Sequence, residues 1–272
     1  MLAASFFFAL MNVLVKLVPD VPAIQVVFIR SVVSLVLSIL FLWSRGLSFW
    51  GKNKKLLLLR GGSGAVALVL FFYTLQVMPL ASAVTIQFMS PVFTAILGIF
   101  LAKEKVGTFQ WFCFAFSFAG VVVVNGFDDR ITPFLLALGI IASVFSGLAF
   151  NFIRMINVSE HPMVIVFYFP LVTLPFTGAW SVFGWTSPTP WQWGILVCIG
   201  IVVQLAQFLM TRAYQLEEIS KIASIKYTGI VYALIFGWLF FDEHFNYQSY
   251  LGMAMVLIGV MANLAYKRYS TK

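Results

Sequence analysis

Charged side chains are scarce in this sequence. Only 10% of its 272 residues are Asp, Glu, Lys or Arg, whereas 62% are hydrophobic and the mean hydropathy is +1.00. A soluble globular domain carries about 25% charged residues, which cover its surface. The composition therefore excludes a soluble domain and predicts an all-α membrane protein.

Residues that carry most enzymatic chemistry are also few. The two histidines, His161 and His244, lie at the ends of apolar runs, while Cys113 and Cys198 lie inside such runs, as packing residues do. The GGSG stretch at 61–64 matches the pattern around an intramembrane protease serine, but that chemistry needs a histidine at membrane depth. The sequence also lacks a cluster of histidine, cysteine and carboxylate that would bind zinc. It therefore predicts no enzyme, no metal site and no cofactor.

Apolar runs of about twenty residues recur along the whole chain, and each is long enough to cross a bilayer. Short links rich in turn residues separate them. The first run starts at Met1 without a charged leader segment or a cleavage site, so we expect a membrane helix rather than a signal peptide. The ten predicted spans cover residues 2–18, 23–44, 56–78, 81–102, 108–125, 133–156, 162–183, 191–214, 219–241 and 247–266.

Basic residues are distributed unevenly among the links. With the N-terminus in the cytoplasm, thirteen basic residues fall on the cytoplasmic side and only Arg130 falls in an outer loop. This asymmetry follows the positive-inside rule and predicts that both termini are cytoplasmic. It also accounts for the net charge of +8 without nucleic acid as a partner. The cytoplasmic set is Arg45, Lys52, Lys54, Lys55, Arg60, Lys103, Lys105, Arg154, Arg212, Lys221, Lys267, Arg268 and Lys272.

The two halves of the chain resemble each other. When residues 73–125 are shifted by about 139 positions, Glu104 falls on Glu243, and at nearly the same offset Arg30 falls on Tyr168. We therefore expect an internal repeat that covers most of the chain.

An odd number of spans in each half makes this repeat an inverted one. Residues 1–128 form the first five-helix repeat and residues 129–272 form the second, which enters the membrane with the opposite orientation. Inverted repeats are typical of secondary transporters, in which two similar halves rock about a central site. The sequence offers no ATP-binding segment, so we expect no ATP-driven pumping.

Specific stretches carry a family resemblance. An apolar helix that ends in a glutamate before a short link occurs twice, as FLAKEKVGTFQW and FFDEHFNYQSYLG. In NVLVKLVPDVPAIQVVFIRSVVS a lysine ends the first helix and an arginine lies early in the second. With the ten spans and the 5+5 repeat, the entire chain resembles the EamA-type members of the drug/metabolite transporter superfamily. The resemblance implies a carrier in the bacterial inner membrane, commonly an exporter of amino acids or related metabolites. The first helix lacks the glutamate of the similar small multidrug pumps, which argues against exchange of cationic drugs for protons.

Charges inside the predicted spans are the first candidates for a site. All nine acids fall in loops or at helix ends, and Glu104 and Glu243 each precede a helix, where capping of its N–H groups predicts a structural role. Arg30 and Lys226 lie about seven residues, or roughly 10 Å, inside their spans. At that depth each must face a cavity, a partner or water. Either the substrate is the counter-ion of these cations, or they are structural and bond to carbonyls or water.

Polar and aromatic residues at similar depth complete the candidate site. Gln87 is the repeat counterpart of Lys226, and two further glutamines share one helical face. For these glutamines, helix–helix hydrogen bonds are an equal alternative, and the tyrosines are also suited to packing. The candidate substrate-binding residues are Lys226, Arg30, Gln87, Tyr168, Tyr227, Gln204, Gln207, Asn12, Asn151 and Tyr73.

Two classes of substrate fit this set. The first is an amino acid or related carboxylate-bearing solute, which the protein would export by alternating access. The second is a larger organic anion, such as a phosphorylated or nucleotide-linked solute, which it would exchange. In both cases the partners are an anionic or zwitterionic small molecule and membrane lipid, and the protein is a monomer or a homodimer.

Overall fold

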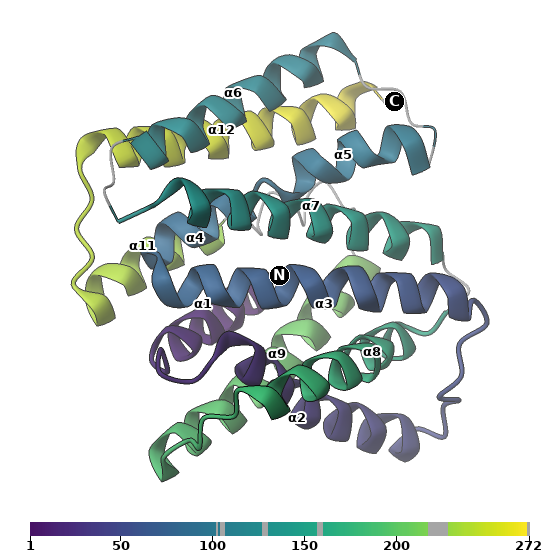
Figure 1. The fold of residues 1–272 in the computed structure, drawn as a ribbon. Coiled ribbons are helices and arrows are strands. Elements are labelled where there is room, and N and C mark those ends of the chain that lie inside the picture. The colour runs from purple at the N-terminus through teal and green to yellow at the C-terminus, as the bar shows by residue number, and fades with distance from the viewer. Residues whose placement is uncertain (102, 104–106, 127–129, 157–159, 217–227, 271–272) are drawn as a thin grey trace.

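The computed structural model describes residues 1–101, 103, 107–126, 130–156, 160–216 and 228–270, and these residues form a bundle of α-helices without strands (Figure 1). The helices are α1 (Leu2–Lys16), α2 (Ala23–Ser44), α3 (Lys54–Val77), α4 (Leu80–Gln87), α5 (Ser90–Leu101), α6 (Thr108–Gly126), α7 (Pro133–Ile156), α8 (Pro162–Phe183), α9 (Pro190–Leu216), α11 (Thr228–Phe241) and α12 (Tyr247–Ser270).

Local sequence sets where many of these helices begin. Pro133, Pro162 and Pro190 are the first residues of α7, α8 and α9. Proline suits this position because its φ is already helical and its missing N–H would have no helical partner. Asn53 caps α3, where its side-chain oxygen accepts the N–H of Leu56 at 3.3 Å.

The lengths of the helices fit a membrane. Six segments in the described part of the chain are long and apolar enough to cross one, and three further helices are apolar but shorter. The ninth predicted span is described only from residue 228, as α11. The structure therefore agrees with a multi-pass membrane protein, while the number of ten spans stays a prediction. The six segments are Ala23–Ser44, Lys54–Val77, Leu80–Leu101, Pro133–Ile153, Pro162–Phe183 and Pro190–Met210.

The fourth predicted span is not one continuous helix, which corrects the sequence-based prediction. It is divided into α4 and α5 by a turn at residues 88–89. Pro91 explains the break, because it has no N–H to donate to the carbonyl of Gln87 and its ring crowds the preceding turn. At the end of α4 the Ile86 carbonyl oxygen accepts the hydroxyl of Ser143 on α7 at 2.8 Å and the N–H of Met89 at 2.9 Å.

The helices pack in matching pairs. Three contacts occur twice, once with each set of corresponding helices. The contact of α1 with α9 corresponds to that of α7 with α3, and the contact of α2 with α9 corresponds to that of α8 with α3. The contact of α11 with α1 corresponds to that of α5 with α7. α2 also packs on α8, α4 on α11 and α6 on α12, and Figure 1 shows this last pair side by side at the top of the bundle. Buried apolar side chains from the first four helices, α11 and α12 contribute to the main core.

The bundle has two ends that carry different links. The α3–α4, α8–α9 and α11–α12 links lie on the left in Figure 1, whereas the α2–α3 link lies on the right. We call the left side the Lys16 end, because Lys16, the last residue of α1, contacts the α3–α4 and α11–α12 links there.

Candidate functional site

A small pocket lies between α2, α3, α8 and α9. Its empty volume is about 240 Å³ with the open mouth included, and its enclosed part has room for about one water molecule. Polar and apolar side chains both face it. The polar residues are Arg30, Ser34, Arg60, Gln204 and Gln207, and the apolar residues are Val166, Phe169, Pro170 and Val203.

Two buried arginines dominate the pocket. Arg30 on α2 is 3% exposed and Arg60 on α3 is 9% exposed. Their guanidinium carbons lie 5.3 and 4.7 Å from the centre of the same ring, that of Phe169 on α8. The Nε and Nη1 atoms of both arginines have no hydrogen-bond partner among the described residues. No acid from the described part of the chain lines the pocket.

Burying two guanidinium groups without a counter-ion is costly. Because both lie close to one ring, their carbons are at most about 10 Å apart, and at an effective dielectric constant near 20 they repel by about 1.7 kcal/mol or more. Desolvation adds several kcal/mol for each ion. Contact with Phe169 returns only about 0.5–2 kcal/mol for each arginine. An anion bound in the pocket would supply the missing attraction.

The structure brings three of the predicted site residues together. Arg30, Gln204 and Gln207 line the same pocket, and the two glutamines lie one turn apart on α9, as their spacing predicted. The side-chain amide of Gln204 donates to the hydroxyl of Ser38 on α2 at 3.1 Å. This bond fixes the position of Gln204 beside the arginines.

Two other predicted residues form hydrogen bonds between helices. The Gln87 amide at the end of α4 donates to the hydroxyl of Ser146 on α7 at 2.7 Å. The Asn151 amide on α7 donates to the carbonyl of Thr94 on α5 at 2.9 Å. Both bonds tie α7 to the broken pair α4 and α5, and the Gln87 bond is of the helix–helix kind that the sequence left open as an alternative.

Three further predicted residues, Asn12, Tyr168 and Tyr73, are described by the structure but do not line the pocket. Asn12 is buried in α1, and its side-chain oxygen has no partner among the described residues. Tyr168 is buried in an apolar cluster of α2, α3, α7 and α8, and within the described structure its hydroxyl is unpaired too. Tyr73 is exposed on α3. Lys226 and Tyr227 lie outside the described residues.

Sequence reasoning missed Arg60. It assigned this arginine to the cytoplasmic group of basic residues, but the structure buries Arg60 inside α3. The distance from the helix start could have indicated its burial, because Arg60 lies almost as far from the start of α3 as Arg30 lies from the start of α2.

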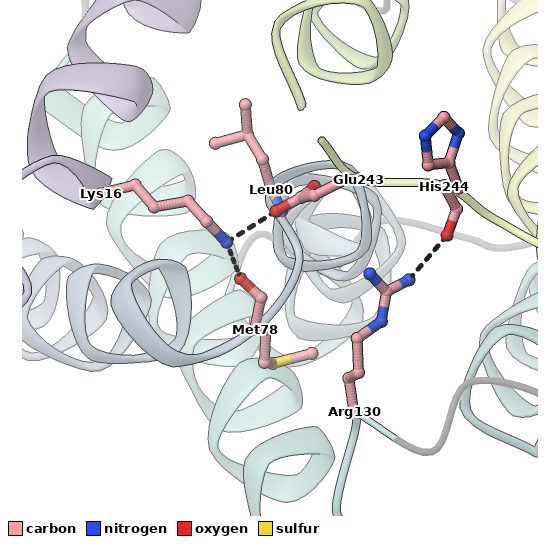
Figure 2. Close-up of polar contacts among 6 residues, drawn as sticks. All are labelled: Lys16, Met78, Leu80, Arg130, Glu243 and His244. Carbon is pink, nitrogen blue, oxygen red and sulfur yellow. Dashed lines mark hydrogen bonds and ion pairs between the residues drawn. The ribbon is translucent and has the colours of Figure 1, made fainter. Parts of the chain in front are cut away.

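A second polar cluster joins several helices at the Lys16 end (Figure 2). The Lys16 ammonium lies 2.7 Å from a carboxylate oxygen of Glu243 and also donates to the Met78 carbonyl. Both carboxylate oxygens of Glu243 accept the N–H of Leu80, at 2.9 and 2.8 Å. The side chains of Lys16 and Glu243 are only 13% and 6% exposed. One buried ion pair thus links α1, the α3–α4 link and the α11–α12 link.

The structure corrects the role expected for Glu243. Glu243 precedes α12, but its carboxylate binds the first N–H of α4 instead, at Leu80. Asn246 caps α12, since its side-chain oxygen accepts the N–H of Ser249 at 2.9 Å. A helix N-terminus favours the nearby negative charge, whichever chain segment supplies it. Glu104, the repeat counterpart, lies outside the described residues.

Comparison with known proteins identifies relatives over 70–95% of the chain. The pseudopaline exporter CntI of Pseudomonas aeruginosa (strain UCBPP-PA14) is 32% identical over 265 residues, which cover 95% of this chain and 92% of that protein. Solute carrier family 35 member G1 of Mus musculus is 28% identical, with 88% and 70% covered. The S-adenosylmethionine uptake transporter of Rickettsia bellii is 26% identical, with 70% and 67% covered.

Structural and family comparisons agree with these relatives. A protein of known crystal structure superposes with a TM-score of 0.67 at 15% identity, with 99% of each chain covered, and shares the fold. The model of the EamA-like transporter family matches residues 1–126 and again residues 133–265. Family and relatives indicate a multi-pass membrane transporter rather than an enzyme. The chain belongs to the EamA-like transporter family.

Proposed function

We propose that this transporter exports a small carboxylate-bearing metabolite, such as an amino acid or a related solute, across the bacterial inner membrane by alternating access. One observation carries the proposal. Arg30 is buried in a pocket between helices, and its Nε and Nη1 atoms have no hydrogen-bond partner among the described residues. A substrate carboxylate is the counter-ion that such a group requires.

The chemistry of the pocket suits a carboxylate. A guanidinium group presents a planar fork of N–H donors that can bind both oxygens of a carboxylate at once. Gln204 and Gln207 add amide groups, whose oxygens suit the ammonium of an amino acid.

The proposed mechanism rests on two inverted halves, residues 1–128 and 129–272. The two separate family matches and the matching helix pairs support this division. The pocket lies between α2 and α3 of the first half and α8 and α9 of the second. A site between two repeats becomes accessible from alternate sides when the halves rock against each other.

The Lys16–Glu243 pair fits this mechanism as a closure between the halves. Lys16 belongs to the first half and Glu243 to the second, and they meet at the Lys16 end. With both termini cytoplasmic, as we propose, this end faces outward. The pair would then hold the outer side closed in this conformation and separate when the path opens outward.

Direction and the role of Lys226 also belong to the proposal. The relatives include both an exporter and an uptake transporter, and the more similar of these two, at 32% identity, is the exporter. Lys226 lies outside the described residues, and we retain it as a second cation along the same path.

Transport in proteoliposomes tests the proposal. Vesicles are loaded with labelled amino acids or with the corresponding amides, and counterflow is measured for the wild type and for Arg30→Gln and Lys226→Met. Loss of a charged hydrogen-bond partner costs about 1.5–3 kcal/mol, so Arg30→Gln should weaken carboxylate binding by about 10- to 150-fold.

The matched control is Arg45→Gln, because Arg45 lies exposed at the end of α2. This variant should transport like the wild type. Equal transport of carboxylates and amides by the wild type would contradict the proposal, and so would unchanged carboxylate transport by Arg30→Gln. A defect in Lys226→Met that is limited to carboxylates would support its place on the path.

A further inference from the structure

The pocket contains one more cation than a single carboxylate can neutralise. Arg60 comes from a different helix than Arg30, yet both guanidinium groups face the same pocket and the same ring of Phe169. At least nine-tenths of each side chain is buried. Two nitrogens of Arg60, like two of Arg30, have no hydrogen-bond partner within the described structure.

We propose that Arg60 is a second substrate-binding residue and that the pocket selects a short dicarboxylate, with one carboxylate on each guanidinium group. This inference rests on the proposed function, because it narrows the class of carboxylate-bearing solutes transported through the same site. Arg60 then determines specificity, whereas Arg30 is needed for any carboxylate.

The balance of charge favours two carboxylates over one. A zwitterionic monocarboxylate would neutralise one guanidinium group but would bring its ammonium close to the other. A dicarboxylate neutralises both groups and offers each a planar partner for its paired N–H donors. Neither arginine then depends on an acid from the protein, in agreement with the absence of acids from the described pocket lining.

The apolar part of the lining favours a carbon chain between the two charges. Val166, Phe169 and Val203 face the pocket together with the arginines. The enclosed part holds about one water molecule in this conformation, so the solute would enter when the halves rock and widen the pocket, and its hydrocarbon segment would then cover these side chains while its two ends reach the two cations. A phosphate monoester concentrates its charge in one group, so it would leave this apolar surface without an equivalent contact.

Ligand binding to the full chain in detergent tests the inference. The probes are succinate and glutarate, with butyrate and valerate as monocarboxylates of the same chain lengths and glycerol 3-phosphate as the phosphate monoester. Dissociation constants come from thermal stabilisation across a concentration series of each probe. The variants are Arg60→Gln, Arg60→Lys and Arg30→Gln, and exposed Arg45→Gln is the control.

We expect the wild type and Arg45→Gln to bind each dicarboxylate about tenfold or more tightly than the matching monocarboxylate. Arg60→Gln should reduce this difference to about threefold or less while still binding monocarboxylates. Arg60→Lys keeps the charge but loses the planar fork, so it should restore part of the difference. This partial rescue separates a binding role from a general effect on folding.

Three results would overturn the inference. They are a wild type that does not distinguish the two classes, an Arg60→Gln variant that keeps the full difference, and tighter binding of glycerol 3-phosphate than of either dicarboxylate. The proposed function fails separately, when Arg30→Gln binds every carboxylate as the wild type does. If Arg60→Gln still prefers dicarboxylates over monocarboxylates as the wild type does, while Arg30→Gln loses carboxylate binding, only the role of Arg60 is refuted.

Discussion

Replacing Lys16 with methionine should destabilise the fold measurably. Methionine keeps much of the length of the side chain but removes its charge, so the Glu243 carboxylate loses the ammonium at 2.7 Å and, among the described residues, keeps the N–H of Leu80 as its hydrogen-bond donor. Glu243 is 6% exposed, so water cannot readily replace the lost partner. The variant therefore leaves a buried carboxylate that is only partly satisfied.

The expected cost follows from this burial. Removing one partner of a buried ion pair typically costs about 3–5 kcal/mol. Lys16 is 13% exposed and Glu243 keeps a hydrogen bond, so we expect the lower end, about 3 kcal/mol. Glu243→Gln should also destabilise the fold, because the Lys16 ammonium then loses the carboxylate charge at 2.7 Å and keeps uncharged neighbours such as the Met78 carbonyl and the Phe241 ring. The double variant should cost less than both single effects together, by about 1 kcal/mol or more.

Equilibrium unfolding in mixed micelles, titrated with dodecyl sulfate, measures these free energies. The control is Asp242→Asn, because Asp242 pairs with His244 at 3.0 Å but both side chains are exposed, at 92% and 70%. Asparagine also tolerates the positive φ of 50° at this position. This exposed pair should contribute less than about 1 kcal/mol. Additive effects of the Lys16 and Glu243 substitutions, within about 0.5 kcal/mol, would refute the reasoning.

Further predictions concern close packing and loop attachment. A Cβ at Gly120 on α6 would lie 2.7 Å from the Gly252 carbonyl oxygen on α12, so Gly120→Ala should destabilise the fold by about 1–3 kcal/mol. Gly62→Ala is the control for unfolding measurements, because a Cβ there meets no atom within 4 Å and alanine favours helix. Gln25 exchanges hydrogen bonds with both backbone groups of Thr186, at 2.7 and 3.0 Å. Gln25→Leu should therefore cost about 1–3 kcal/mol and increase amide exchange in residues 184–189, and unchanged exchange would contradict this attachment.

The fold could be read from the sequence where hydrophobicity and turn residues coincide. The predicted spans 23–44 and 162–183 match α2 and α8 at both ends, because proline and polar residues bound the apolar runs. The break between α4 and α5 was missed, although Pro91 was visible in the run. Hydropathy does not change when one backbone N–H donor is missing, as it is at Pro91. The break is evident only from the backbone hydrogen bonds around it.

The lining of the candidate site could be predicted only in part. The sequence singles out Arg30, Gln204 and Gln207, which line the pocket, because unusual polarity inside an apolar helix is a local signal. The Lys16–Glu243 pair was not predicted, since its partners come from opposite ends of the chain and only tertiary packing brings them together. Arg60 was not predicted as a pocket residue because hydropathy locates the start of a helix only to within a few residues. A basic residue near that start can therefore be assigned to the cytoplasmic link although it is buried in the second turn of the helix.

The two polar clusters differ in whether the described residues supply a counter-ion for the buried cation. At the Lys16 end a buried cation meets an acid of the same protein and a backbone carbonyl, and the acid in turn accepts a backbone N–H. In the pocket, two buried cations meet an aromatic ring but no acid among the described residues. Burial costs are similar in both places, so a protein that needed only stability would gain by supplying the pocket with an acid as well. An acid there would compete with the proposed carboxylate substrate, which is a physical reason for the described pocket lining to lack one.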